Sequence, residues 1–282
     1  MRLRYVLVDV FTEHKFQGNQ LAVFPDVDAA LPTAQLQALA LELGLSESTF
    51  VVGRGERGPR VRIFTPEVEL PFAGHPTLGT AAVVSPGQAV TLELNVGPVA
   101  VDVATTAYGW RAELTAPPAA RVPLADDDAG ASWAARFGLA AADVDRSLPV
   151  EAWSCGNAFG LLPVVDAAAV ARAHISSAPP AAGEPLGVVV FAVSGADVRA
   201  RVFIPGSRVP EDPATGSANA PLCAYLHAHG RLALGSTLTT TQGVEMGRPS
   251  RLWARLERDG DGILRPRVAG GVVRVGEGAF DV

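Results

Sequence analysis

The sequence has few charged residues, a single lysine, no basic run and no long apolar run. Only 18% of its 282 residues are charged, and Lys15 is the single lysine. The formal net charge is -6 and no run of basic residues occurs, so the positive surface that binds nucleic acids or anionic membranes is missing. No stretch approaches the ~20 apolar residues of a membrane-spanning helix. We therefore expect neither a nucleic-acid nor a membrane partner.

Residues that bind metals or carry cofactors are also scarce. Cys155 and Cys223 are far apart and the five histidines are dispersed, so we expect neither a disulfide framework nor a metal site. A pyridoxal phosphate enzyme would have only Lys15 for its Schiff base. Asp9 interrupts the apolar N-terminal segment and no small-residue cleavage site follows, which favours a strand over a signal peptide. We expect a cytoplasmic protein without cofactor or metal.

What the sequence does contain is an internal repeat. Hydrophobic residues make up 48% of the chain, and its length suits one large or two modest domains. Three short segments return in the same order: GNQLAVF from Gly18 as GNAFGLL from Gly156, RIFTP from Arg62 as RVFIP from Arg201, and ELPFAGH from Glu69 as EDPATGS from Glu211. The ordered set predicts two similar domains.

Local patterns predict mostly strands around one buried helix in each half. Apolar spacing predicts a helix over 32–44, ended by Gly44. The segments 75–84 and 217–230 suit buried helices, and short β-branched runs between them suit strands. We predict an α+β fold of two pseudo-symmetric domains, 1–118 and 119–282, joined by a surface linker near 115–130. The sequence leaves open whether the strand near 268–282 rejoins the first domain.

The repeated motifs place a glycine at the start of each buried helix. A helix N-terminus offers unpaired N–H groups and a positive dipole end, and two such ends, at Gly74-His75 and Gly216-Ser217, suit a small carboxylate. The structural alternative is that Thr215 or Ser217 caps the helix while Asp212 favours its positive end.

Two further residues are candidates for proton transfer. Glu47 precedes the apolar run 50–52, which suits either a general acid/base or a capping carboxylate at a helix-to-strand turn. His75 is either a hydrogen-bonded structural residue or a proton donor and acceptor.

Longer segments resemble a known family. LSESTFV, RIFTPEVELPFAGHPTLGTA, EDPATGSANAPLCAYLHAHG and QGVEMGRPS are similar to signature segments of the PhzF-like phenazine-biosynthesis isomerases, within the wider diaminopimelate-epimerase fold. The opening VDVFTEHKFQGNQLAVF is similar too, with Gln20 where a proline is usual. The resemblance implies two domains, each a sheet wrapped around a central helix, an active site in the cleft between them, a homodimer, and catalysis without cofactor or metal.

The resemblance also implies roles for individual residues. Glu47 is then the general acid/base, which in the family's best-understood member moves a proton between carbons of trans-2,3-dihydro-3-hydroxyanthranilate. The residues expected to line the site or hold the substrate are His75, Asp212, Ser217, Ala73, Gly74, Thr215 and Gly216. Two alternatives stay open, a small-acid-binding protein and a racemase or epimerase. Neither cysteine lies in the glycine motifs, which disfavours a two-thiol racemase.

Overall fold

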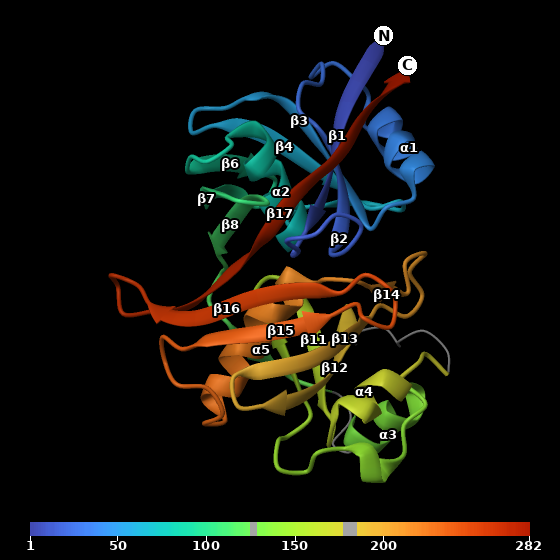
Figure 1. Cartoon of the computed structure of the whole chain (residues 1–282), viewed down its shortest axis with the longest axis vertical. Coiled ribbons are helices and arrows are strands. Elements are labelled where there is room, and N and C mark those ends of the chain that lie inside the picture. Colours follow the sequence, from blue (N-terminus) through green and yellow to red (C-terminus); the bar gives the residue numbers. More distant parts are fainter. Residues whose placement is uncertain (125–128, 177–184) are drawn as a thin grey trace. The chain divides into compact units, whose positions relative to one another are not determined.

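A computed structural model describes residues 1–124, 129–176 and 185–282 of the chain. The chain forms two compact units. Unit 1 comprises Met1–Thr115 and Ala269–Val282, and unit 2 comprises Ala116–Val268. Strand β17 (Leu264–Asp281) begins in unit 2 and continues into unit 1, so both chain ends belong to unit 1 (Figure 1).

The strands of unit 1 close into a ring. β1 pairs with β17 and β2, β2 with β3, β3 with β4, β4 with β6, β6 with β7, β7 with β8, and β8 with β17. Parallel pairs occur between β2 and β3 and between β4 and β6, so the sheet is mixed. The remaining strand bounds are β1 (Arg2–Val10), β2 (Asn19–Phe24), β3 (Glu47–Arg54), β4 (Pro59–Phe64), β5 (Glu69–Leu70), β6 (Val90–Leu94), β7 (Gly97–Thr106) and β8 (Gly109–Thr115).

Helix α2 (Gly74–Val84) packs inside this ring, against β1, β2, β3, β6, β7 and β8. It is rich in small and apolar residues, and every residue from Gly74 to Ala82 is buried, as expected for a helix with no solvent face. Gly79 allows this close packing, because a Cβ there would lie 2.6 Å from a methyl group of Leu21 and 2.9 Å from one of Val10. The predicted buried helix of the first half is confirmed.

Helix α1 (Thr33–Leu43) covers the other face of the same strands. Its buried side chains, Leu36, Leu39 and Ala40, share a core cluster with Phe24 and Phe50. The helix ends at Gly44, whose positive φ of 62° gives the left-handed cap that glycine adopts without steric cost. The helix predicted over 32–44 is therefore confirmed.

Unit 2 has a second mixed sheet. β10 pairs with β9 and β11, β12 joins β11 in parallel, β13 follows β12, and β15 lies parallel to β13 and antiparallel to β16. The strand bounds are β9 (Ala120–Val122), β10 (Glu151–Ser154), β11 (Ala158–Pro163), β12 (Gly187–Ser194), β13 (Asp197–Phe203), β14 (Glu211–Asp212), β15 (Thr237–Gln242) and β16 (Ser250–Arg258).

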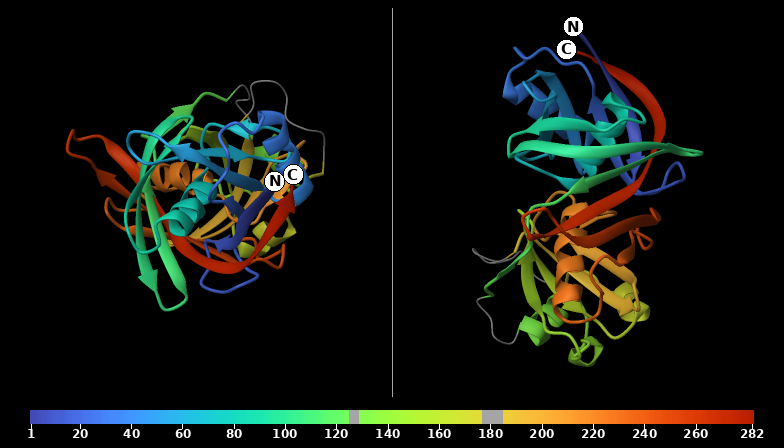
Figure 2. Two further views of the ribbon diagram at one scale, coloured as in Figure 1. Left: turned by 90° about the horizontal axis from the view of Figure 1, so that it is seen from above. Right: turned by 90° about the vertical axis from the view of Figure 1, so that its left-hand side faces the viewer.

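Helices cover both faces of this sheet too. α5 (Gly216–Ala228), the orange helix in Figure 2, packs against β10, β11 and β16. It is buried from Ala218 to Leu226, which confirms the second predicted buried helix. On the other face, α3 (Ala129–Arg136) and α4 (Ala167–Arg172) share a core cluster with β11, β12 and β13 that includes Phe137, Leu162 and Phe203. A short 3-10 helix spans Ala141–Asp143.

The linker predicted near 115–130 is wrong in part. Ala120–Val122 forms strand β9, which pairs antiparallel with β10. Three residues are too few for an alternating pattern to be visible in the sequence. Residues 125–128, which include the acidic run, lie outside the described residues. Among the helices that the structure describes, none is long and apolar enough to cross a membrane.

Candidate active site

Glu47 is the first residue of β3, in unit 1. Side chains alternate between the two faces of a strand, so Glu47 and Thr49 point the same way and Ser48 the other. The hydroxyl groups of Thr49 and Thr80 lie 2.8 Å apart, which identifies the shared face as the one toward α2. The side chain of Glu47 is 16% exposed. It is therefore a carboxylate that faces the buried helix and retains some access to solvent.

His75 lies in the first turn of α2 and is 3% exposed. Its Nδ1 is 3.2 Å from Asn19 Nδ2. A neutral ring in which Nδ1 accepts from this amide carries its proton on Nε2. Burial lowers the pKa of His75 to about 3, against a smaller opposite effect of the Gln20 backbone. His75 is thus neutral near pH 7.

The protonated Nε2 of His75 faces Glu47. The distance from Nε2 to Glu47 Oε2 is 3.5 Å, which is at the outer limit of a hydrogen bond. Because the imidazole is neutral, the contact is a polar one between a carboxylate and a donor, not an ion pair. Glu47, His75 and Asn19 therefore form a chain of polar side chains that joins β3, α2 and β2.

The N-terminus of α2 carries no side-chain cap. The N-cap residue is Ala73, which has no polar side chain, and its carbonyl accepts bonds from the amide and hydroxyl of Thr77. Gly74 is the first helical residue and is buried. The positive helix end next to His75 thus has no acidic group in its first turn, an arrangement that favours an anion.

Asp212 belongs to a buried network in unit 2. The Thr215 hydroxyl donates to Asp212 Oδ2 at 2.6 Å. Gln242, at the end of β15, donates to the Asp212 carbonyl at 2.7 Å and to the Thr215 hydroxyl at 3.0 Å, and its Oε1 accepts from the Thr215 amide at 3.2 Å. Asp212, Thr215 and Gln242 are each less than a tenth exposed. These four hydrogen bonds therefore hold the turn before α5.

This network bears on one part of the capping alternative for α5, the cap at Thr215. Thr215 occupies the N-cap position, but no side chain there accepts a bond from the helix. Its hydroxyl is directed to Asp212 instead. The first helical residues are Gly216, which is buried, and Ser217, which is partly exposed. The N-cap side chain of α5 therefore leaves the first amides of the helix uncapped.

The predicted site residues therefore lie in two groups. Unit 1 brings together Glu47, His75, Ala73 and Gly74. Unit 2 brings together Asp212, Thr215, Gly216 and Ser217. That the two groups meet around one substrate stays a prediction.

Sequence reasoning missed two residues that support these groups. Asn19 follows Gly18 in the repeated Gly-Asn pair, and that repeat was the signal for it. Gln242 ends a predicted strand, within a segment that resembles the family, but its bonds to Asp212 and Thr215 join residues far apart in the chain.

The geometry can be compared with known proteins. The model of the phenazine biosynthesis-like protein family (PhzC-PhzF) matches residues 8–278. The chain belongs to this family. A trans-2,3-dihydro-3-hydroxyanthranilate isomerase of Pseudomonas fluorescens is 35% identical over 283 residues, which cover 98% of each chain. The prediction of a PhzF-like isomerase is confirmed.

Solved structures agree with this membership. A Pseudomonas aeruginosa protein described as a predicted epimerase is 34% identical, with a TM-score of 0.83 and 99% of each chain covered. A Bacillus anthracis phenazine biosynthesis protein of the PhzF family covers 100% of each chain with a TM-score of 0.89, and at 23% identity it shows the shared fold. The mixed sheet with few helices is therefore the fold of the family.

Proposed function

We propose that this chain is a cofactor-independent isomerase that moves a proton between two carbons of a small unsaturated or cyclic carboxylate, with Glu47 as general acid/base. The observation that carries the proposal is a partly accessible glutamate beside a neutral histidine, at the uncapped N-terminus of a buried helix. The named activity of the Pseudomonas fluorescens relative supports trans-2,3-dihydro-3-hydroxyanthranilate, or an analogue, as substrate.

The reaction needs only one carboxylate. Glu47, as carboxylate, takes a proton from one carbon; the electron pair of the broken C–H bond forms a new double bond to the next carbon, and the π electrons of the old double bond move onto the second carbon. Glu47, now protonated, returns the proton to that second carbon and recovers its charge. The double bond has moved, no electrons have been gained or lost, and the enzyme is unchanged.

His75 assists Glu47 because it is neutral. Its Nε2 lies 3.5 Å from Glu47 Oε2, and we propose that it donates to this oxygen when substrate is bound. A protonated imidazole at the same place would stabilise the carboxylate and make it a weaker base. The burial that lowers the pKa of His75 to about 3 therefore preserves the basicity of Glu47. Loss of His75 or of Asp212 is expected to slow turnover by roughly 10²- to 10⁴-fold.

The substrate carboxylate is proposed to bind at the glycine-containing helix ends. Unit 1 contributes Ala73 and the amide of Gly74, and unit 2 contributes Thr215 and the amides near Gly216. Asp212 and Ser217 are proposed to contact polar groups of the substrate. Uncapped N–H groups and the positive end of the helix dipole favour an anion at each position.

We also infer that the two units are copies of one pattern. In unit 1 the pairings along the chain are antiparallel β1–β2, parallel β2–β3, antiparallel β3–β4 and parallel β4–β6. In unit 2 they are antiparallel β10–β11, parallel β11–β12, antiparallel β12–β13 and parallel β13–β15. This order supports two pseudo-symmetric domains. The expected homodimer is to be measured by light scattering of the purified protein.

A racemase that works with two thiols has little support. Cys223 lies in α5 and Cys155 in the turn between β10 and β11, and both are buried. Burial raises the pKa of each thiol to about 12, so neither supplies a thiolate near neutral pH. A Glu47-dependent proton shift needs no thiolate.

The test is exchange of substrate hydrogen with deuterated water, read by mass spectrometry. Wild-type protein is expected to form the isomerised product and to incorporate deuterium, while Glu47→Gln does neither, because an amide cannot take the proton. Cys155→Ser serves as a control and retains exchange. Undiminished exchange in Glu47→Gln would refute the role of Glu47. Tight binding without exchange, across a panel of cyclic carboxylates, would favour the small-acid-binding alternative.

A further inference from the structure

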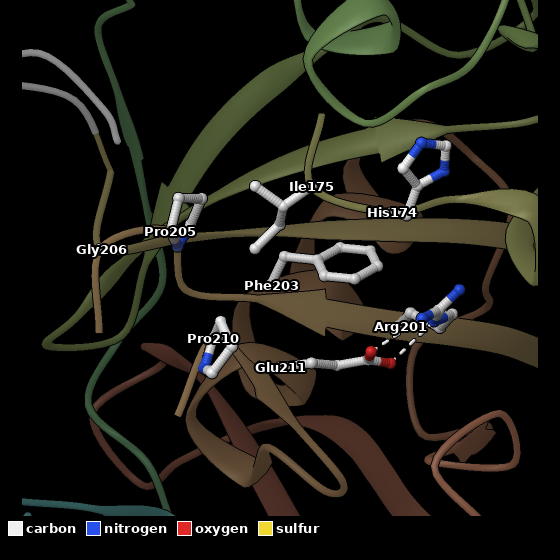
Figure 3. Close-up of a pocket in the computed structure, with 8 residues that line it drawn as sticks. All are labelled: His174, Ile175, Arg201, Phe203, Pro205, Gly206, Pro210 and Glu211. Atoms are coloured by element: carbon white, nitrogen blue, oxygen red, sulfur yellow. Dashed lines mark hydrogen bonds and ion pairs between the residues drawn. The ribbon is translucent and has the colours of Figure 1, made fainter. Parts of the chain in front are cut away.

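The repeated segments RIFTP and RVFIP place one arginine in each unit against the glutamate of the next motif. In unit 1, Arg62 donates from Nε to Glu69 Oε1 at 2.8 Å and from Nη2 to Oε2 at 2.6 Å. In unit 2, Arg201 makes the same two bonds to Glu211, both at 2.7 Å (Figure 3). We call these pairs the Arg–Glu forks. Two parallel bonds match the planar shapes of guanidinium and carboxylate.

The forks also share their surroundings. The Arg62 guanidinium lies 5.1 Å from the ring centre of Phe64, and that of Arg201 lies 4.8 Å from the ring centre of Phe203. The bond to Arg62 lowers the pKa of Glu69, so this glutamate is charged near pH 7.

Each fork is tied to the outer helix of its unit. Arg62 Nη2 also donates to the Thr33 hydroxyl, at the start of α1, at 2.9 Å. Arg201 Nη1 donates to the carbonyls of Ala171 and Ala173, at the end of α4. Each glutamate is therefore held from the outer face of its sheet, and Glu69 Oε1 accepts a further bond from Asn95 Nδ2 at 2.8 Å.

The glutamates lie in the shortest of the strands described above. β5 and β14 contain two residues each, and each pairs with its neighbour over two positions. With so few ladder bonds, side chains hold much of the segment in place: in β14 these are Arg201, which binds Glu211, and Gln242, which binds the Asp212 carbonyl. The next element along the chain is in each case the buried helix, which begins at Gly74 in unit 1 and at Gly216 in unit 2.

In unit 2 the geometry reaches Asp212 directly. Glu211 and Asp212 are consecutive in β14, so their side chains point to opposite faces of the strand. Glu211 meets Arg201 on one face, while Asp212 accepts from the Thr215 hydroxyl on the other. A rotation of β14 about its own axis would turn both carboxylates together. The fork on the outer face thus restrains β14 from the side opposite to the Thr215 and Gln242 bonds that hold Asp212 on the inner face.

We propose that the Arg201–Glu211 fork is a positioning pair for Asp212, and that the Arg62–Glu69 fork positions the turn that leads to His75. The proposal rests on the proposed function, which places Asp212 and His75 at the substrate. In this proposal neither Arg–Glu fork contacts the substrate; each acts through the residue that it positions. Lysine cannot replace either arginine, because its ammonium makes a single point contact.

The test is a double-mutant cycle with Glu211→Gln, Asp212→Asn and the double variant, assayed for isomerisation at a temperature where all are folded by circular dichroism. Because the fork acts through Asp212, Glu211→Gln alone is expected to lower kcat/KM by roughly tenfold, mainly through kcat, and to change it by less than about twofold in the Asp212→Asn background. Arg201→Lys should match Glu211→Gln. Glu69→Gln and His75→Gln form the parallel cycle for unit 1.

The matched control is Arg265→Lys. Arg265 donates from Nε to Asp259 Oδ2 at 2.7 Å, at the turn between β16 and β17, and its loss should leave kcat/KM unchanged. Two results would overturn the proposal: a Glu211→Gln variant with wild-type kcat/KM, or losses from Glu211→Gln and Asp212→Asn that multiply in the double variant. If Glu211→Gln does not fold, Arg201→Lys completes the same cycle.

A readout without substrate separates this proposal from the proposed function. In protein with ¹³C-labelled aspartate, the carboxyl signal of Asp212 is assigned by its loss in Asp212→Asn. Glu211→Gln is expected to shift that signal and Arg265→Lys to leave it in place. If wild-type protein shows no isomerisation, the proposed function fails while the shift still tests the fork. An unchanged Asp212 signal in Glu211→Gln overturns the fork proposal alone.

Discussion

His75 is expected to make the stability of the protein depend on pH. Burial lowers its pKa from 6.5 to about 3 in the folded chain. Below pH 6.5 the unfolded chain therefore binds a proton at His75 that the folded chain does not accept until about pH 3. Because the unfolded state binds more protons, the free energy of unfolding falls as the pH falls through this window.

The size of the effect follows from the two pKa values. Between about pH 7.5 and about pH 5, protonation of His75 in the unfolded chain removes about 2 kcal/mol from the free energy of unfolding. This loss of free energy hardly changes for any folded-state pKa of His75 below about 4, because at pH 5 the folded histidine is then neutral in nearly every molecule.

The assay is urea unfolding of wild-type protein and of His75→Gln at both pH values. Any loss of stability caused by the substitution itself is present at both, so it cancels in the difference. Wild-type protein should lose about 2 kcal/mol more than His75→Gln between the two conditions. An equal loss in the two proteins would show that His75 titrates alike when folded and unfolded, and the lowered pKa of His75 would have to be abandoned.

Three further outcomes are expected. Gly79→Leu should lower the free energy of unfolding by at least about 1–3 kcal/mol in urea titrations, because α2 cannot accept a side chain against β1 and β2; a stable variant would contradict the packing. Gln242→Leu should cost about 2–4 kcal/mol and lower turnover through Asp212, since it breaks three bonds of a buried network; thermal melts and rates give both numbers. Cys155 and Cys223 should resist a thiol reagent near neutral pH until denaturant is added, and rapid labelling of folded protein would refute their burial.

Much of the fold could be predicted because local patterns and long-range packing agree. The helix that ends at Gly44 and the two buried helices have composition and end signals suited to their environment. β9 was missed because three residues carry no periodicity. The repeat of RIFTP and RVFIP was visible in the sequence. It indicates that the segment is duplicated, but it does not indicate that the arginine of each copy binds the glutamate of the next motif.

The candidate site was predicted less completely, because its supporting contacts join distant parts of the chain. Glu47 and His75 were found from their motifs, whereas the contact between them depends on how β3 and α2 pack. Gln242 reaches Asp212 across unit 2, and nothing near Gln242 in the sequence indicates that bond. The capping alternative for Thr215 was reasonable locally, and the carboxylate of Asp212 takes its hydroxyl instead.

The course of β17 has a consequence for how the protein is made. The ring of strands in unit 1 is completed only by residues 269–281, which follow the whole of unit 2 in the chain. Until they arrive, β1 and β8 each present an open edge on which another chain can pair. Unit 2, which ends at Val268, is by then fully synthesised. β1 therefore gains its second neighbour only after unit 2 has been made, and removal of β17 should cause aggregation.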